Sequence, residues 1–262
     1  QVVAYRAAVM AHRTGREWRP LVDTTIAVNY GAPSAWANWR RQNDFYLEGQ
    51  LLWMAVDMKI RQLSHDVHSI DDFARAFFGV DNGSYVTHTY TFDDVVAGLD
   101  KVQPYDWAGF LHTWVDGTGD QVPLLSGIEA SGWKLVYRDE PNAWAKAQAK
   151  HGRGGASFIH SIGLDLDRSG KVGEVRWDSP AFDAGVGTGM TVVAVNDIAY
   201  GKDVMEDAIR AAKDGTAPTR LLVRTFDRYR SIDIDYHGGL RHPHLERIEG
   251  TPDYLTKIFT AR

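Results

Sequence analysis

Residues 178–197 read DSPAFDAGVGTGMTVVAVND, and this stretch decides how the second half of the chain is organised. Ser179 directly before Pro180 is typical of a helix start, because a serine hydroxyl accepts a free backbone N–H and proline fits the first turn. The run Val192 to Val195 predicts a strand, and Asn196-Asp197 predicts a tight turn after it. We therefore expect a short helix, a strand and a turn in close succession.

The residues on either side extend this β-rich pattern. Downstream, a helix is expected from about Asp203 to Lys213, stopping at Gly215, followed by two strands joined near Asp227-Arg228. One face of these strands would carry Leu221, Val223, Thr225, Ile232, Ile234 and Tyr236. Upstream, the glycine cluster of Gly152, Gly154 and Gly155 predicts a linker. We expect a small β-rich domain over residues 151–238.

Residues 1–150 show helical rather than alternating periodicity. From Asp44 to Leu63 the apolar residues form a wide stripe, which predicts a mostly buried helix. Three shorter helices follow, and each begins with a capping residue: Ser69, Thr91 and Asp106. The fold class expected from this pattern is multidomain, α and β, with an all-α helical bundle over 1–150 before the β-rich domain. Thr251-Pro252 opens an amphipathic turn, which predicts a docking tail over 239–262.

The composition excludes several classes of function. The formal net charge of the 262 residues is −5, so no broadly basic nucleic-acid surface is expected. The chain has no cysteine, which excludes disulfides, thiolate metal sites and cysteine nucleophiles. No run of eighteen apolar residues suits a transmembrane helix, and the first residues lack the basic-then-apolar pattern of an export signal, so neither is expected within this segment. The start at Gln1 suggests a processed chain or an excised piece of a longer one.

The order of elements over residues 153–238 resembles a PDZ domain of the bacterial protease-associated kind. PDZ domains add a peptide C-terminus as a strand to an open sheet edge and hold its carboxylate with backbone N–H groups. The resemblance implies that Ser161-Ile162-Gly163-Leu164 is the carboxylate loop and that Val204, Ala208 and Ala211 face the groove. The partners implied are a peptide substrate or protein C-termini. The alternative is that these are ordinary core residues of a domain that binds no free peptide.

Four further stretches resemble the glycyl aminopeptidase family of thermolysin-like zinc metallopeptidases, in which a PDZ domain follows the catalytic domain. They are RPLVDT at 19–24, FYLEGQLLW at 45–53, SIDDFARAFFG at 69–79 and HLERIEGTP at 244–252. The resemblance spans almost the whole chain. It implies a thermolysin-like C-terminal subdomain, then the PDZ domain, then the tail, and it suggests a periplasmic location.

The chain departs from this family in one important respect. Such enzymes hold zinc with H-E-x-x-H on one helix and a downstream glutamate, and no such motif occurs among the ten histidines here. The resemblance implies that the zinc ligands lie in the N-terminal remainder of a parent catalytic domain, so this fragment needs no cofactor and is expected to be inactive alone. Neither the pair His65 and His68 nor the EF-hand-like Asp165–Gly170 completes a metal site.

One catalytic residue is nevertheless implied. In related zinc aminopeptidases a tyrosine in a Tyr-x-x-Gly helix start donates its O–H to the tetrahedral oxyanion, and Tyr46 with Gly49 fits that pattern. The alternative is a half-buried structural tyrosine, and Glu48 is expected to be a solvated first-turn acid. The function expected is the C-terminal fragment of a zinc aminopeptidase acting on small N-terminal residues such as glycine. The rival is a non-enzymatic PDZ scaffold that binds peptides.

Overall fold

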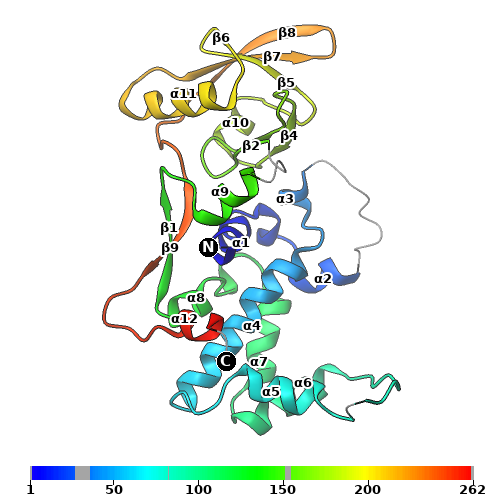
Figure 1. Cartoon of the computed structure of the whole chain (residues 1–262). Helices are drawn as coiled ribbons and strands as arrows, with labels where there is room; N and C mark the ends of the chain where they lie inside the picture. The colour runs from blue at the N-terminus through cyan, green and yellow to red at the C-terminus, as the bar shows by residue number, and fades with distance from the viewer. Residues whose placement is uncertain (1, 27–35, 82, 151–154, 261–262) are drawn as a thin grey trace. The chain divides into compact units, whose positions relative to one another are not determined.

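The computed structural model describes residues 2–26, 36–81, 83–150 and 155–260 (Figure 1). The chain divides into two compact units. Unit 1 comprises Gln1–Gly15, Asn29–Gln42 and Leu135–Leu245, and unit 2 comprises Arg16–Val28, Asn43–Lys134 and Glu246–Arg262. The expected division at 1–150, 151–238 and 239–262 stays a prediction. Two of its linker glycines, Gly152 and Gly154, lie outside the described residues.

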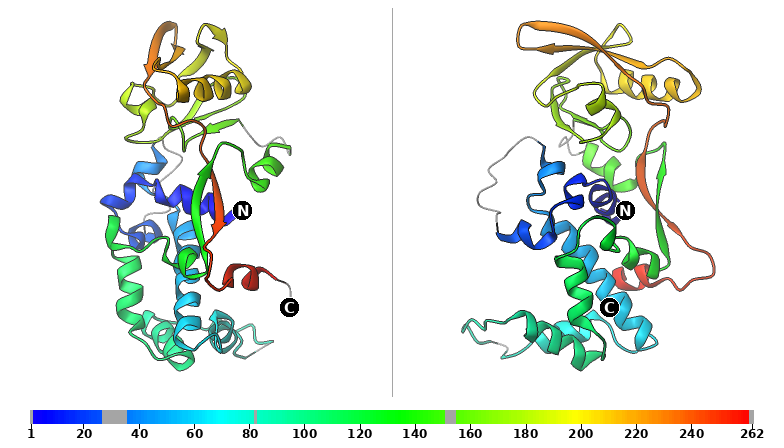
Figure 2. Two further views of the ribbon diagram at one scale, coloured as in Figure 1. Left: turned by 90° about the vertical axis from the view of Figure 1, so that its left-hand side faces the viewer. Right: turned by 180° about the vertical axis from the view of Figure 1, so that it is seen from behind.

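Unit 2 is built from helices around α4. Its helices are α2 (Leu21–Ile26), α4 (Asp44–Leu63), α5 (Ile70–Phe78), α6 (Phe92–Val102), α7 (Trp107–Val115), α8 (Ser126–Ala130) and α12 (Tyr254–Phe259). Consecutive helices from α4 to α7 pack each against the next (Figure 2). Helix α8 crosses α4 closely at Gly127, where a Cβ would lie 2.7 Å from the backbone nitrogen of Ala55. The close crossing therefore requires glycine at this position.

The predicted helix starts in unit 2 are confirmed. Ser69 and Thr91 each form a capping box with an aspartate three residues later, and the side chain of Asp106 accepts a hydrogen bond from Gly109 N at 2.9 Å. The helix predicted from Asp44 to Leu63 has these bounds in the structure. Local capping chemistry and periodicity are sufficient to define these elements.

Unit 2 also buries a network of charged side chains. Arg61 donates from Nε to Asp57 at 3.0 Å and from Nη1 to Asp66 at 2.6 Å, and the side chains of Arg61 and Asp57 are almost fully buried. The second carboxylate oxygen of Asp57 accepts the N–H of Ile70 at 2.8 Å, at the start of α5. Lys257 of α12 pairs with Asp66. Each buried charge in this network therefore has an opposite charge beside it.

Unit 1 contains the β-rich part together with three helices from elsewhere in the sequence. The additional helices are α1 (Val2–Ala11), α3 (Ala37–Arg40) and α9 (Ala143–Lys150). The β-rich part contains β2 (Ala156–Phe158), β3 (Leu164–Leu166), β4 (Val172–Val175), α10 (Pro180–Asp183), β5 (Thr191–Val195), β6 (Ile198–Ala199), α11 (Lys202–Asp214), β7 (Thr219–Thr225) and β8 (Arg228–Ile234). The strands form one sheet in the order β2-β3-β4 and another in the order β6-β5-β7-β8.

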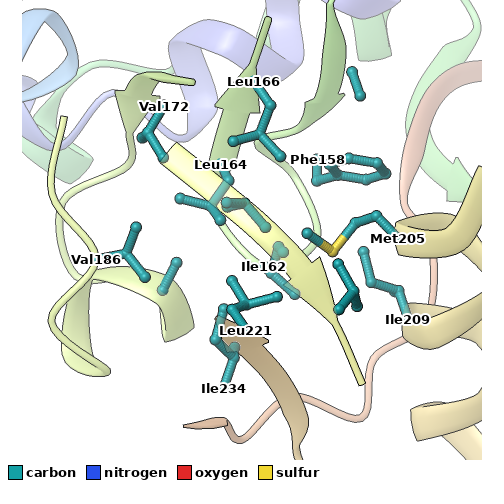
Figure 3. Close-up of a cluster of buried hydrophobic side chains, with 14 of the residues drawn as sticks. Phe158, Ile162, Leu164, Leu166, Val172, Val186, Met205, Ile209, Leu221 and Ile234 are labelled. Atoms are coloured by element: carbon teal, nitrogen blue, oxygen red, sulfur yellow. The ribbon is translucent and has the colours of Figure 1, made fainter. Parts of the chain in front are cut away.

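The two sheets and α11 enclose one hydrophobic core (Figure 3). Phe158 of β2 and Leu164 of β3 are buried in it with Met205 and Ile209 of α11, as are Leu221 and Ile234 of the β7–β8 hairpin. Val223 and Ile232 lie in the same core, as the alternation predicted. The period-two pattern therefore identified the inner face of this hairpin.

The predicted turns around the deciding stretch are also present. Ser179 Oγ accepts the N–H of Phe182 at 3.3 Å, and Pro180 occupies the first turn of α10. Asn196 and Asp197 have φ of 48° and 65°, the left-handed pair that a two-residue hairpin turn requires. The second hairpin turns at Phe226-Asp227, one residue earlier than expected, because Arg228 already belongs to β8.

The expectation of an all-helical first part is wrong at one element. Residues Trp133–Arg138 form strand β1, which pairs with β9 (His242–Arg247) in a two-stranded sheet. The two strands are more than a hundred residues apart in sequence, so no local signal marks their pairing. The segment expected as a tail therefore begins with a strand, and α12 follows it. Among the described residues, no helix combines the length and apolar character needed to cross a bilayer.

Candidate functional site

Tyr46 lies in the first turn of α4, at the position the Tyr-x-x-Gly pattern indicated. Its side chain is 64% exposed, and its hydroxyl has no hydrogen-bond partner in the described part of the chain. The ring contacts Phe45 with 4.4 Å between centroids, and no atom lies within 4 Å of the place where a Cβ of Gly49 would be. An exposed phenol on a rigid helix can donate to an atom outside this unit. The catalytic role of Tyr46 stays a prediction.

Glu48 is not the solvated acid that the sequence suggested. It is fully buried and pairs with Arg16, whose Nε lies 3.3 Å from its Oε2. The residue sits on the inner face of α4, where an isolated carboxylate would be costly and a guanidinium compensates it. Glu48 therefore stabilises unit 2 and does not face solvent.

The carboxylate loop implied by the PDZ resemblance lies immediately before β3. Gly163 has φ of 90°, and a Cβ there would collide with the side chain of Ser179. The backbone N–H groups of Ser161 and Gly163 both donate to the carbonyl oxygen of Phe158, each at 3.0 Å. Two N–H groups expected to hold a peptide carboxylate are therefore engaged within the chain.

The sheet edge expected to receive a peptide is also engaged. Strand β3 pairs with β4 on one side and with β2 on the other, and Phe158 of β2 lies opposite Leu164. Because β2 is hydrogen-bonded to β3, it occupies the edge where an added peptide strand would pair. A peptide that binds β3 would have to displace β2.

The remaining groove residues divide between core and surface. Ile162, Leu164 and Ala208 are buried in the hydrophobic core, Val204 packs against that core, and Ala211 is exposed on α11. The structure thus brings Ile162, Leu164, Val204 and Ala208 together in or against the core, and Ala211 lies apart from them. Peptide binding at this place stays a prediction.

The residues considered as metal ligands, His65, His68 and the loop at Asp165–Gly170, do not form a metal site in the described part of the chain. Among residues 2–26, 36–81, 83–150 and 155–260, no group of three or more His, Asp and Glu side chains is arranged to hold a metal ion. His65 has φ of 52° in the turn after α4, and the ring of His68 is 3.8 Å from Asp72. Asp167 accepts the N–H groups of Ser169 and Lys171 and thereby closes the turn between β3 and β4.

A cavity in unit 1 was missed by the sequence analysis. Its volume is about 530 Å³. Its walls come from α1, α9, β2, the first turns of α11 and the start of β9, and they include Tyr5, Pro141, Trp144, Lys146, Ser157, His160, Lys202, Glu206, Arg241, His242 and Pro243. None of the predicted groove residues lines it. Because five separate segments supply these side chains, no local motif could have indicated the cavity.

A cluster of cationic and aromatic side chains around Tyr137 adjoins this cavity. The Tyr137 hydroxyl and His12 Nε2 are 2.8 Å apart, and the guanidinium of Arg241 lies 4.3 Å from the Tyr137 ring centroid. Burial lowers the pKa of His12 to about 4, and the charges of Arg176 and Arg241 act in the same direction. Burial likewise lowers the pKa of His160 to about 3. Both histidines are therefore neutral at neutral pH.

No protein-family model and no curated protein matches the sequence. Among solved structures, that of an aminopeptidase N family protein from Idiomarina loihiensis is similar, with a TM-score of 0.63 and 13% sequence identity. The match covers 97% of this chain and 44% of that chain. At this identity the likeness is one of fold. The chain thus folds like part of an aminopeptidase N family protein and spans less than half of its length.

Proposed function

We propose that this chain is the C-terminal part of a zinc aminopeptidase that removes small N-terminal residues such as glycine. The observation that carries the proposal is the fold likeness to an aminopeptidase N family protein over 97% of this chain. The four resembling stretches of sequence, which include Tyr46 and Gly49, point in the same direction.

The described residues of this chain do not offer a zinc ligand set. In the proposal, the zinc, its ligands and the general base therefore belong to a preceding part of a longer chain, and we assign no step through the metal to residues of this one. What this chain would contribute is a helical wall of the substrate cleft.

Within that wall, Tyr46 would act on the oxygen of the scissile carbonyl. Its exposed hydroxyl has no hydrogen-bond partner among the described residues of unit 2. The phenol O–H would donate a hydrogen bond to the negative charge that develops on this oxygen as the tetrahedral intermediate forms. A donor of this type contributes up to about 3–4 kcal/mol of transition-state stabilisation.

The test begins with the coding sequence that precedes Gln1, which should encode H-E-x-x-H and a later glutamate. The full-length protein should then contain zinc and hydrolyse glycyl chromogenic substrates. In that protein Tyr46→Phe should lower kcat at least ten-fold. The matched control is Tyr85→Phe, whose ring is 98% exposed in the α5–α6 connection and which should leave kcat unchanged.

Two results would contradict the proposal in different ways. A preceding sequence without metal-binding histidines would exclude the peptidase. Near-wild-type turnover of Tyr46→Phe in an active full-length enzyme would remove Tyr46 from the mechanism and leave the fold assignment intact.

As a second candidate we propose the non-enzymatic peptide-binding role, in which a protein C-terminus pairs with β3. Its support is the shortness of β2, since a strand of only three residues is the part of this sheet that a peptide could most readily replace on β3. Titration with C-terminal peptides should then change the amide resonances of β2 and β3 together. Unchanged resonances at peptide saturation would exclude exchange at this edge.

A further inference from the structure

The cavity of unit 1 combines an aromatic wall with a cationic wall. Tyr5 of α1 and Trp144 of α9 pack with 4.6 Å between ring centroids, and Pro141 and Pro243 extend this apolar side. Lys146, Lys202 and Arg241 supply positive charge to the remaining walls, and among the described residues that line the cavity the one carboxylate is that of Glu206. A cavity of about 530 Å³ lies within the range of about 300–1,000 Å³ that is typical of small-molecule sites.

Two of the three cations already have carboxylate partners. Lys202 Nζ is 3.3 Å from Glu206 Oε1, and Lys146 Nζ is 3.8 Å from Glu140 Oε2. Arg241 has no ion pair in the described part of the chain, and its Nε is buried without a hydrogen-bond partner. The wall therefore carries one uncompensated positive charge.

The surroundings of Arg241 increase this excess of positive charge. Arg176 also has no ion pair in the described ranges, and it is near enough to Arg241 that the two charges repel. Burial is the main cause that lowers the pKa of Arg176, and the charge of Arg241 acts in the same direction. Arg176 does not line the cavity, but its charge makes the burial of Arg241 without a carboxylate still less favourable, unless an anion from outside the chain pairs with Arg241.

His160 is a second, independent indication of a ligand. Its side chain lines the cavity and the residue is only 7% exposed, yet neither ring nitrogen has a hydrogen-bond partner among the described residues. Buried polar atoms are nearly always paired, so this ring is arranged for a partner that the chain does not contain. The nearby positive charges disfavour a metal ion at His160 and favour a negatively charged hydrogen-bond acceptor.

We propose that this cavity binds a carboxylate carried by an apolar or aromatic residue, such as the C-terminal residue of a peptide. Arg241 forms the ion pair, neutral His160 donates one hydrogen bond, and the rings of Tyr5 and Trp144 pack against the apolar group. A single uncompensated cation on the wall matches a monoanion better than a doubly charged phosphate. The site is distinct from the β3 edge and does not depend on the proposed peptidase function.

The test compares two probes that differ only in charge at one end. N-acetyl-Gly-Phe with a free carboxylate and its C-terminal amide are titrated into the chain, with calorimetry and tryptophan fluorescence as readouts. The acid should bind at least ten-fold more tightly than the amide. Equal affinity of acid and amide, or binding of neither, would overturn the proposal. Inorganic phosphate in place of the acid should bind weakly, and tighter binding of phosphate would overturn the assignment to a carboxylate.

Variants test which residue makes the acid bind more tightly than the amide. Arg241→Gln should weaken binding of the acid at least ten-fold and leave the amide unchanged. The matched control is Arg228→Gln, an exposed arginine of the same unit at the β7–β8 turn, which should bind as the wild type does. Unchanged affinity of Arg241→Gln would overturn the site. If Arg241→Gln does not fold, the comparison of acid with amide on the wild-type chain still decides, because it needs no variant and no catalysis.

Discussion

In unit 2 the buried Arg61 lies between two carboxylates, whereas in unit 1 no carboxylate of a described residue pairs with the partly buried Arg176 or Arg241. Glu48 repeats the arrangement of unit 2, because its buried carboxylate is paired with Arg16. Arg176 and Arg241 of unit 1 instead lie close enough to aromatic rings for their charges to act on Tyr137, His12 and His160, and the guanidinium of Arg241 lies over the ring of Tyr137. Unit 2 thus compensates the buried charges of Arg61 and Glu48, whereas in unit 1 the described residues give Arg176 and Arg241 no carboxylate partner.

The difference separates a structural use of charge from a binding use. A buried ion pair satisfies both partners within the chain and only fixes the packing of the helices around it. An uncompensated cation destabilises the fold that holds it, so a protein retains it where an external anion completes the pair. Removing charge should therefore have opposite effects on stability in the two units.

The largest effect is expected from breaking the pair in unit 2. Asp57→Asn removes one of the two negative charges beside buried Arg61. The uncharged amide oxygen is also a weaker acceptor than the carboxylate for the N–H of Ile70. The free energy of unfolding of this unit should fall by about 3–5 kcal/mol, as is usual when one partner of a buried ion pair is removed. Urea unfolding followed by circular dichroism measures the change. Asp93→Asn, an exposed aspartate in the first turn of α6, is the control and should have little effect.

The next effect is a pH dependence confined to unit 1. The pKa values of folded His12 and His160, about 4 and about 3, lie below the value of about 6.5 expected in an unfolded chain. The unfolded state therefore binds more protons below pH 6.5. The contribution of these two histidines to stability is complete above that pH and is lost as the pH falls toward 4, by up to about 1.4 kcal/mol per pH unit for each histidine. Buried Asp165, whose pKa is raised to about 6, offsets part of this loss.

Unfolding free energies measured at intervals between pH 7 and 4.5 test this dependence. His160→Phe removes one titrating group, so the slope should fall by one proton whatever the variant does to absolute stability. His112→Gln, whose ring forms an exposed pair with Asp116, should keep the wild-type slope. A His160→Phe slope equal to that of the wild type would show that His160 titrates normally in the folded state.

The sequence predicted the helices and strands of both units better than it predicted which charged side chains are buried or paired. The apolar stripe of α4 and the caps at Ser69 and Ser179 are local signals, so the helices they begin were identified directly. Strand β1 was missed, although Trp133, Leu135 and Tyr137 alternate as strand residues do, because its partner β9 is far away in sequence. Glu48 was misjudged since position in a first turn does not reveal which face is buried. The cavity requires five segments to meet, and that information is tertiary.

A smaller effect of opposite sign is expected in unit 1. Arg176→Met removes one of two repelling cations and keeps the length of the side chain. The free energy of unfolding should stay unchanged or rise by about 1 kcal/mol, because an uncompensated buried charge is replaced by an apolar group. The pKa values of His12 and His160 should also rise toward 6.5, since the charge of Arg176 lowers both. Proton NMR of the histidine rings measures that shift. A marked loss of stability with unchanged histidine pKa values would show that Arg176 has a structural role.

The smallest effect is expected where charges are paired but exposed. Arg220 and Asp233 face each other across β7 and β8, with 2.9 Å between Nε and Oδ1, and each side chain is about half exposed. Water and salt screen such a pair, so Asp233→Asn should change the urea midpoint far less than Asp57→Asn does. Any change should disappear at about 1 M salt, where the screening length is only about 3 Å. If Asp233→Asn destabilised the fold as strongly as Asp57→Asn at high salt, the presence of a charge pair alone would determine how much stability is lost when one partner is removed. Burial would then no longer explain the contrast between the two units.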